Sequence, residues 1–211
     1  MTTYFLKQKR RYLFYFSLSA VGVFYLFRVE WMEEYAFGCE VVLALLLAMI
    51  CCFILENRDE AELIHCTKYR VQQVFYTQLA VLYGYMLLTV TAAQLLAHII
   101  IPCERGAVLW LVFSYGITGL FFVGVSSAVR RLTGSVYVAV GITLFITLMS
   151  ILLHNSVEVR AWDIRLSFVD VYALSTMYGT KYWIWNRLIF LAAGIALLWI
   201  GYRFGGGKDE D

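Results

Sequence analysis

The sequence predicts an all-α integral membrane protein with six transmembrane helices. Hydrophobic residues make up 62% of its 211 residues and charged residues only 15%, whereas soluble domains carry roughly 25% charged residues. Uncharged runs recur at lengths near the roughly 20 residues that a helix needs to cross a hydrocarbon core of about 30 Å. A transmembrane barrel would show short segments of alternating polarity instead.

Six candidate spans follow one another along the chain. The first is short, and its flanking Arg11 and Arg28 can extend along the helix to reach the lipid headgroups. The third contains no Asp, Glu, Lys or Arg and is longer than a bilayer requires, so we expect it to tilt or protrude. The spans are predicted at about 12–28, 36–55, 71–101, 107–129, 136–153 and 182–202, within one transmembrane domain that covers residues 1–211.

The lysines and arginines of the connections predict the orientation, because short cytoplasmic loops carry an excess of both. With the N-terminus inside, most of them fall on the cytoplasmic side, including the basic residues near positions 7–11, 68–70 and 130–131. The sequence therefore predicts a multi-pass protein of the plasma membrane with both termini in the cytoplasm.

Two connections carry patterns of their own. Residues 56–70, between spans two and three, are rich in charge and in helix-forming residues, and Arg58 and Glu62 lie one helical turn apart. They predict a short cytoplasmic helix, although a solvated connector is the simpler interpretation. Between spans five and six, Ile164, Phe168, Val171 and Tyr172 recur at helical spacing and predict an external amphipathic helix.

Catalytic chemistry is not indicated. The histidines His65, His98 and His154 are scattered, whereas a zinc protease needs ligands clustered on one face. Ser126 and Ser127 are expected at the opposite membrane face from His154, so we interpret them as packing residues rather than nucleophiles. The sequence therefore predicts no enzyme, no metal site and no cofactor in this chain, and no basic surface with interleaved aromatic residues for nucleic acid.

Three further sets of residues allow alternatives. Glu40 and Arg187 fall near the outer ends of spans two and six, where we expect each to reach the membrane interface. Small residues on span four suit close helix packing, within the chain or against another subunit. Cys39 and Cys103 both fall near the external face and could form a disulfide, although two free thiols are favoured. The small residues are Gly116, Gly119, Gly124 and Ala128.

The chain resembles the membrane-spanning subunit of a type-2 ABC exporter, the ABC-2 permease family. Members of this family carry a Glu, a short coupling helix and an Arg between spans two and three. Glu56, the stretch AELIHC and Arg70 match these features, whereas Asp59-Glu60 and Tyr69 stand where Gly-Thr and Pro are usual. The Asn-Arg pair in WNRLIFL and the ending YRF also resemble the last span of the family.

The resemblance implies a permease that moves an amphiphilic or peptide-like substrate out of the cell by alternating access. The chain has no GxxxxGK[ST] motif, so ATP and Mg²⁺ would bind a separate nucleotide-binding ATPase subunit. It also implies a second permease chain, identical or homologous, in the same bilayer, and an external gate at Ile164, Phe168, Val171 and Tyr172. The residues implied to couple to the ATPase are Glu56, Arg58, Glu62, Leu63, His65, Cys66, Thr67 and Arg70.

The alternative comes from another class of protein. A non-transporting six-span protein, such as an assembly factor, an immunity protein or a sensor subunit, would have the same composition and the same small-residue face. It would not need a docking helix for an ATPase, so the role of residues 56–70 separates the two interpretations.

Overall fold

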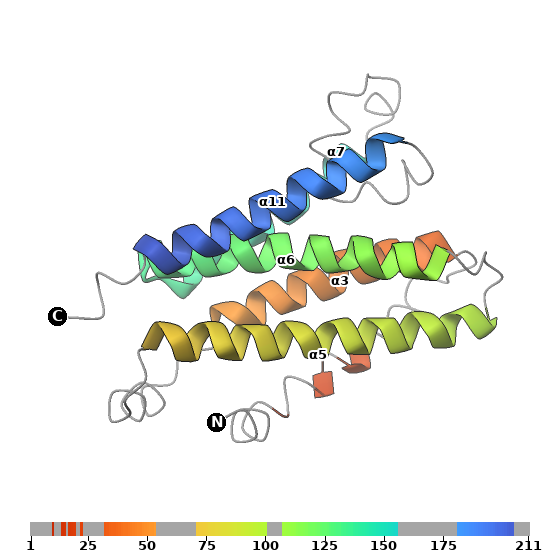
Figure 1. Ribbon diagram of the computed structural model, residues 1–211, viewed down its shortest axis with the longest axis horizontal. Helices are drawn as coiled ribbons and strands as arrows, with labels where there is room; N and C mark the ends of the chain where they lie inside the picture. The colour runs from red at the N-terminus through yellow and green to blue at the C-terminus, as the bar shows by residue number, and fades with distance from the viewer. Residues whose placement is uncertain are drawn as a thin grey trace.

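The computed structural model describes residues 32–53, 71–100, 107–155 and 181–204, together with residues 10, 14, 15, 17–19 and 22. Almost all residues of the four long ranges are helical, and the helices lie roughly along the longest axis of the molecule (Figure 1). Residues 14, 15, 17–19 and 22 are also helical and fall within the first predicted span. The helices are α3 (Met32–Cys52), α5 (Val71–Ile100), α6 (Ala107–Thr133), α7 (Val136–Asn155) and α11 (Lys181–Phe204).

The predicted spans two to six each coincide with one of these helices. Three helices are long and apolar enough to cross a membrane, over Gln73–Leu96, Val112–Thr133 and Trp183–Phe204. Two shorter apolar stretches accompany them, Glu40–Cys52 in α3 and Val136–Leu152 in α7. The all-helical fold of a multi-pass membrane protein is therefore confirmed, while the total of six spans and the cytoplasmic termini stay predictions.

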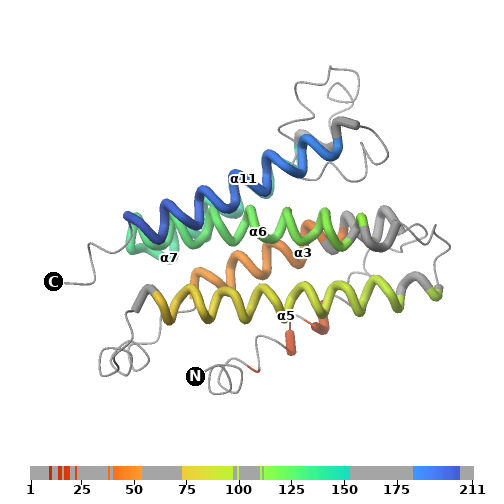
Figure 2. The backbone as a smooth tube through the Cα atoms, in the orientation of Figure 1, coloured from red at the N-terminus to blue at the C-terminus, as the bar shows by residue number. Residues whose placement is uncertain are grey.

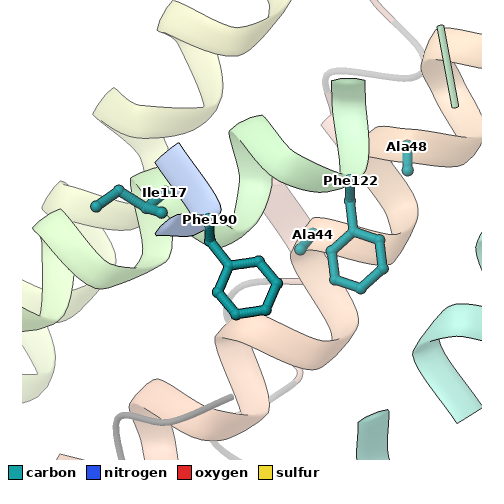
Figure 3. Close-up of a cluster of buried hydrophobic side chains, with 5 residues drawn as sticks. All are labelled: Ala44, Ala48, Ile117, Phe122 and Phe190. Carbon is teal, nitrogen blue, oxygen red and sulfur yellow. The ribbon is translucent and has the colours of Figure 1, made fainter. Parts of the chain in front are cut away.

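Helix α6 occupies the centre of the described bundle. It runs parallel to α3 and α11 and antiparallel to α5, and the tube trace shows it passing between α11 and α3 (Figure 2). Its side chains Tyr115 and Phe122 are fully buried. A core cluster joins α3, α6 and α11 through Ala44, Ala48, Ile117, Phe122 and Phe190 (Figure 3). Helix α6 contacts α3, α5, α7 and α11, so these four helices pack around it.

Small residues let α6 and α11 approach closely. A Cβ atom added to Gly124 would lie 2.7 Å from the carbonyl oxygen of Gly194, and one added to Gly201 would lie 3.1 Å from Cα of Ala128. Gly116 and Gly119 face the side chain of Tyr83 on α5, and the Tyr83 hydroxyl donates a hydrogen bond of 2.5 Å to the Gly116 carbonyl. The small-residue face of the fourth span therefore packs within the chain, which is the first of the two alternatives that the sequence allowed.

A tight turn joins α6 to α7. Gly134 has a φ of 68°, a left-handed conformation that favours glycine, and its amide donates a hydrogen bond of 3.0 Å to the Arg130 carbonyl. The Arg130 guanidinium in turn donates to the Gly134 carbonyl. With this turn, the end of α6 and the start of α7 lie at the same end of the bundle as the last residues of α3 and α11 and the first of α5 (Figure 1).

Aromatic side chains mark two levels along the bundle. Near the start of α6 and α11, the rings of Trp110 and Trp183 lie 5.3 Å apart, and near the other end the rings of Tyr76 and Tyr202 lie 5.4 Å apart. Trp183 and Tyr202 are separated along α11 by about 29 Å at 1.5 Å per residue. This separation matches a hydrocarbon core of about 30 Å, and Trp and Tyr favour its two interfaces. We therefore use the two aromatic levels as the membrane boundaries.

The close approach of α6 and α11 gives a prediction about stability. Gly124→Ala should lower the free energy of unfolding by about 1–3 kcal/mol, because the added methyl group meets the backbone of α11. Gly141→Ala in α7 is the matched control, since a Cβ there meets no atom within 4 Å. It should leave stability unchanged or raise it by up to about 1 kcal/mol. Unfolding of the purified chain in detergent, followed by circular dichroism, measures both, and equal effects would contradict this packing.

Candidate functional site

The most unusual feature of the bundle is a set of charged and polar side chains buried between three parallel helices. Glu40 comes from the third turn of α3, Ser114 and Thr118 come from the first half of α6, and Arg187 lies in the second turn of α11. Ser114 and Thr118 are four residues apart and therefore share one face of α6. Because the three helices begin at the same end of the bundle, residues at similar depths from their starts meet.

The arginine is held mainly by neutral oxygen atoms. Its Nε and Nη2 donate hydrogen bonds of 2.9 and 2.6 Å to Oδ1 of the neighbouring Asn186. Its Nη1 donates to Oγ of Ser114 at 3.1 Å and to Oγ1 of Thr118 at 2.9 Å. The guanidinium carbon also lies 5.7 Å from the centre of the Phe190 ring. Together these partners fix the plane of the Arg187 guanidinium group, so the position of its positive charge is well defined.

The carboxylate reaches the arginine through a hydroxyl group. Oγ of Ser114 donates a hydrogen bond of 2.8 Å to Oε1 of Glu40, while Nη1 of Arg187 lies 4.0 Å from the same oxygen. Oγ1 of Thr118 is 3.5 Å from Glu40 Oε1 but only 3.2 Å from the carbonyl oxygen of Ser114. The Thr118 hydroxyl therefore donates its hydrogen bond to the Ser114 carbonyl rather than to Glu40. Ser114 is therefore the main bridge between the two charges.

Both charges lie inside the bundle rather than at the interface. The side chains of Arg187 and Glu40 are 1% and 0% exposed. Arg187 follows Trp183 by one helical turn, which places it about 6 Å inside the aromatic boundary. The expectation that each side chain reaches the interface is therefore wrong. The physical reason is that α6 offers hydroxyl partners next to both side chains, so neither has to extend toward water.

Such a network has mechanical and electrostatic consequences. An isolated charge in a low-dielectric interior is very unfavourable, so separating Glu40 from Arg187 without a new partner costs several kcal/mol. Ionisable residues within membrane-spanning helices mark functional sites more often than not. The network also connects α3 to α11 across α6, so these helices can separate at this level only if the charges exchange partners.

Among the residues that the structure describes, no cluster of His, Cys, Asp and Glu could hold a metal ion.

A second buried polar group lies on α5. Gln94 is 0% exposed, and neither atom of its amide has a hydrogen-bond partner within the described part of the chain. It shares a face of α5 with Met86 and Val90, which are also fully buried. Because a buried amide without a partner is costly, Gln94 is a candidate contact for a segment outside the described ranges or for another molecule.

The structure describes only some of the residues singled out from the sequence. Cys39 lies in α3 and Cys103 outside the described residues, so their disulfide stays a prediction. Ser126 and Ser127 are buried and donate hydrogen bonds to the Val123 carbonyl of their own helix, at 3.2 and 2.6 Å. The two remaining sets of predicted site residues lie outside the described ranges. The coupling residues are Glu56, Arg58, Glu62, Leu63, His65, Cys66, Thr67 and Arg70. The gate residues are Ile164, Phe168, Val171 and Tyr172.

The network predicts strong coupling between its two charges. Removing one partner, by Glu40→Leu or Arg187→Met, should lower the free energy of unfolding by about 3–5 kcal/mol, because the other charge stays buried. The double variant should lose much less than the sum of the two single variants. Denaturant unfolding in detergent measures the cycle, with Arg203→Met as a control because Arg203 is exposed at the end of α11. Effects that add to within about 0.5 kcal/mol would show that the two charges do not interact.

Comparison with known proteins finds no relative of this chain. A scan against protein-family models matched no family, and neither the curated proteins nor the solved structures contained a match to the chain. Function is therefore inferred from the residues of this chain and from their arrangement.

Proposed function

We propose that this chain is the transmembrane permease subunit of an ATP-driven ABC exporter. In this proposal a separate ATPase subunit binds and hydrolyses ATP, and a second permease chain completes the translocation pathway. The substrate would be amphiphilic or peptide-like and would leave the cell as the helices alternate between inward-open and outward-open arrangements. The motif pattern around residues 56–70 and the described bundle support the proposal in different ways.

The observation that carries the proposal is the connection of α3 to the rest of the bundle. One face of α3 is buried along its length through Leu43, Ala44, Leu47, Ala48 and Cys51. The charged network adds a link from Glu40 to α6 and α11. A force applied at the end of α3 would therefore move α6 and α11 as well, since close-packed helices transmit displacement.

The positions of the end of α3 and the start of α5 support the proposal that this force enters the bundle between them. Helix α3 ends and α5 begins at the end of the bundle that also carries Arg130, Arg131 and Arg203. The positive-inside tendency assigns such an end to the cytoplasm, where an ATPase subunit would dock. Glu56, the short helix-forming stretch that includes Leu63, and Arg70 belong to the segment that joins these two helix ends.

Substitutions in this segment test the coupling role. Glu56→Ala and Leu63→Asp should each reduce substrate-stimulated ATPase turnover of the assembled complex by about tenfold or more, because loss of an anchor residue of a protein interface costs about 2 kcal/mol or more. Glu34→Ala, which removes a carboxylate near the start of α3, is the control and should leave turnover unchanged. Turnover of purified complexes in lipid nanodiscs is measured alongside membrane insertion of each variant.

Cross-linking decides between the exporter and the non-transporting alternative. A cysteine placed by Glu62→Cys or Thr67→Cys should form a cross-link to a co-expressed ATPase subunit, whereas Glu34→Cys should not. Normal stimulated turnover in both coupling variants, together with no cross-link from either position, would overturn the exporter proposal. That outcome would leave the six-span assembly, immunity or sensor protein as the better interpretation.

A further inference from the structure

The surface of α5 carries a seam of residues that follows a heptad repeat. The seam consists of Val81, Tyr85, Leu88, Ala92 and Leu95, which are alternately four and three residues apart. Its first two residues are half-buried, whereas Leu88 and Leu95 are 73% and 54% exposed and Ala92 is exposed as well. Heptad spacing keeps one stripe of a helix facing a neighbouring helix. The outer half of the seam therefore has the pattern of a helix contact while its side chains are exposed.

One described contact identifies the neighbour of the seam. The hydroxyl groups of Ser17 and Tyr85 lie 2.7 Å apart and share a hydrogen bond. Ser17 is half-buried, whereas Phe14 and Tyr15 are each 62% exposed, so this helix turns its Ser17 side toward α5. Ser17 belongs to the first predicted span. The first span therefore already reaches the inner half of the seam.

The length of the chain allows the first span to follow the seam to its outer end. Ile100, the last residue of α5, comes 15 residues after Tyr85, and Met32, the first residue of α3, comes 15 residues after Ser17. The end of α5 and the start of α3 lie at the same end of the bundle (Figure 1). A helix from residue 17 to residue 28 advances about 16 Å at 1.5 Å per residue, and residues 29–31 remain for the turn into α3.

The hydroxyl contact also sets the register of the two helices. In a parallel pair the facing residues keep a constant offset, which is 68 residues for this contact. The same offset places Ala20 level with Leu88, and it places Phe24 level with Ala92. A small side chain thus faces a large one in both layers, which lets two helices pack closely in lipid.

Both ends of the first span suit this register. Arg28 comes level with Leu96, where the apolar stretch Gln73–Leu96 ends, so its charge lies near the headgroups. Toward the other end, Arg10 comes level with Gln78, three residues before the seam begins. Oε1 of Gln78 is buried and has no hydrogen-bond partner within the described part of the chain. A guanidinium donor from the first span would satisfy this oxygen atom.

We propose that the first span pairs with α5 in parallel at this offset, and that residues 18–28 continue as a helix that covers the outer half of the seam. Hydrogen bonds and close packing hold helices together in lipid, so the bond between Ser17 and Tyr85 is the specific element of the pair. The seam is then closed to a second copy of the chain, whose contact must use another face. The pairing does not depend on the exporter proposal, because a non-transporting protein with this fold could contain it too.

Disulfide cross-linking of the full-length chain in membranes tests the pairing. Ala20→Cys combined with Leu88→Cys should form a disulfide within one chain, and so should Phe24→Cys combined with Ala92→Cys, because facing Cα atoms come within about 7 Å. The control is Ala20→Cys combined with Leu95→Cys, which the register separates by about 10 Å along the helix axis. Its yield should be lower by about fivefold or more. Mass spectrometry of the linked peptides distinguishes these disulfides from those of native cysteines.

Tyr85→Phe tests whether the hydroxyl contact sets the register. It should lower the yield of the disulfide between positions 20 and 88 by about threefold, because one hydrogen bond contributes about 1 kcal/mol. Tyr137→Phe is the matched control, since Tyr137 is 87% exposed on α7, and it should leave the yield unchanged. Equal yields from the matched and mismatched pairs, or no disulfide from either matched pair, would overturn the proposal. Disulfides between two chains, seen as dimers on a non-reducing gel, would overturn it in favour of a second copy on the seam.

Discussion

The buried interaction between Glu40 and Arg187 is the constraint on which the described bundle depends. Two opposite charges lie about one helical turn inside the membrane boundary, where neither can be left alone. Ser114 bridges them, and Asn186 and Thr118 also accept hydrogen bonds from the guanidinium. Because these groups come from three different helices, the relative rotation and depth of α3, α6 and α11 are fixed together.

The rest of the packing is consistent with this constraint. Helices in a bilayer associate through close contact and hydrogen bonds, since lipid is as apolar as their side chains. Below the charged network, Gly124 and Gly194 bring the backbones of α6 and α11 together, and Tyr83 binds the backbone of α6 from α5. The bundle therefore has a polar level near one boundary and a level of close backbone contact deeper in the membrane. The polar level lies toward the end of α3 that is opposite to residues 56–70.

Much of the fold follows from the sequence, but the site does not. Long uncharged runs predicted α5, α6, α7 and α11 nearly to their ends, because burial in lipid requires an unbroken apolar helix. The same runs placed Glu40 and Arg187 at similar depths. Depth alone does not show whether a side chain points to lipid, to the interface or to a neighbouring helix.

The direction of each side chain depends on how the helices rotate against one another. The pair Ser114 and Thr118, four residues apart on an apolar helix, was the signal that could have located the network, since hydroxyl groups on one face suit buried charges. The small residues from Gly116 to Ala128 could be assigned to helix packing from their spacing, but their partner on α11 came only from the structure. The coupling segment at residues 56–70 remains a prediction from its resemblance to a family.

The ion pair can hold the three helices together only if Glu40 carries its charge inside the membrane. Infrared difference spectroscopy of the full-length chain in lipid nanodiscs, compared with the Glu40→Gln variant, reports the state of this carboxyl group directly. We predict that the substitution removes a carboxylate band and no band of a protonated carboxyl. Loss of a protonated carboxyl band instead would show that Glu40 is neutral and that no ion pair joins α3 to α11.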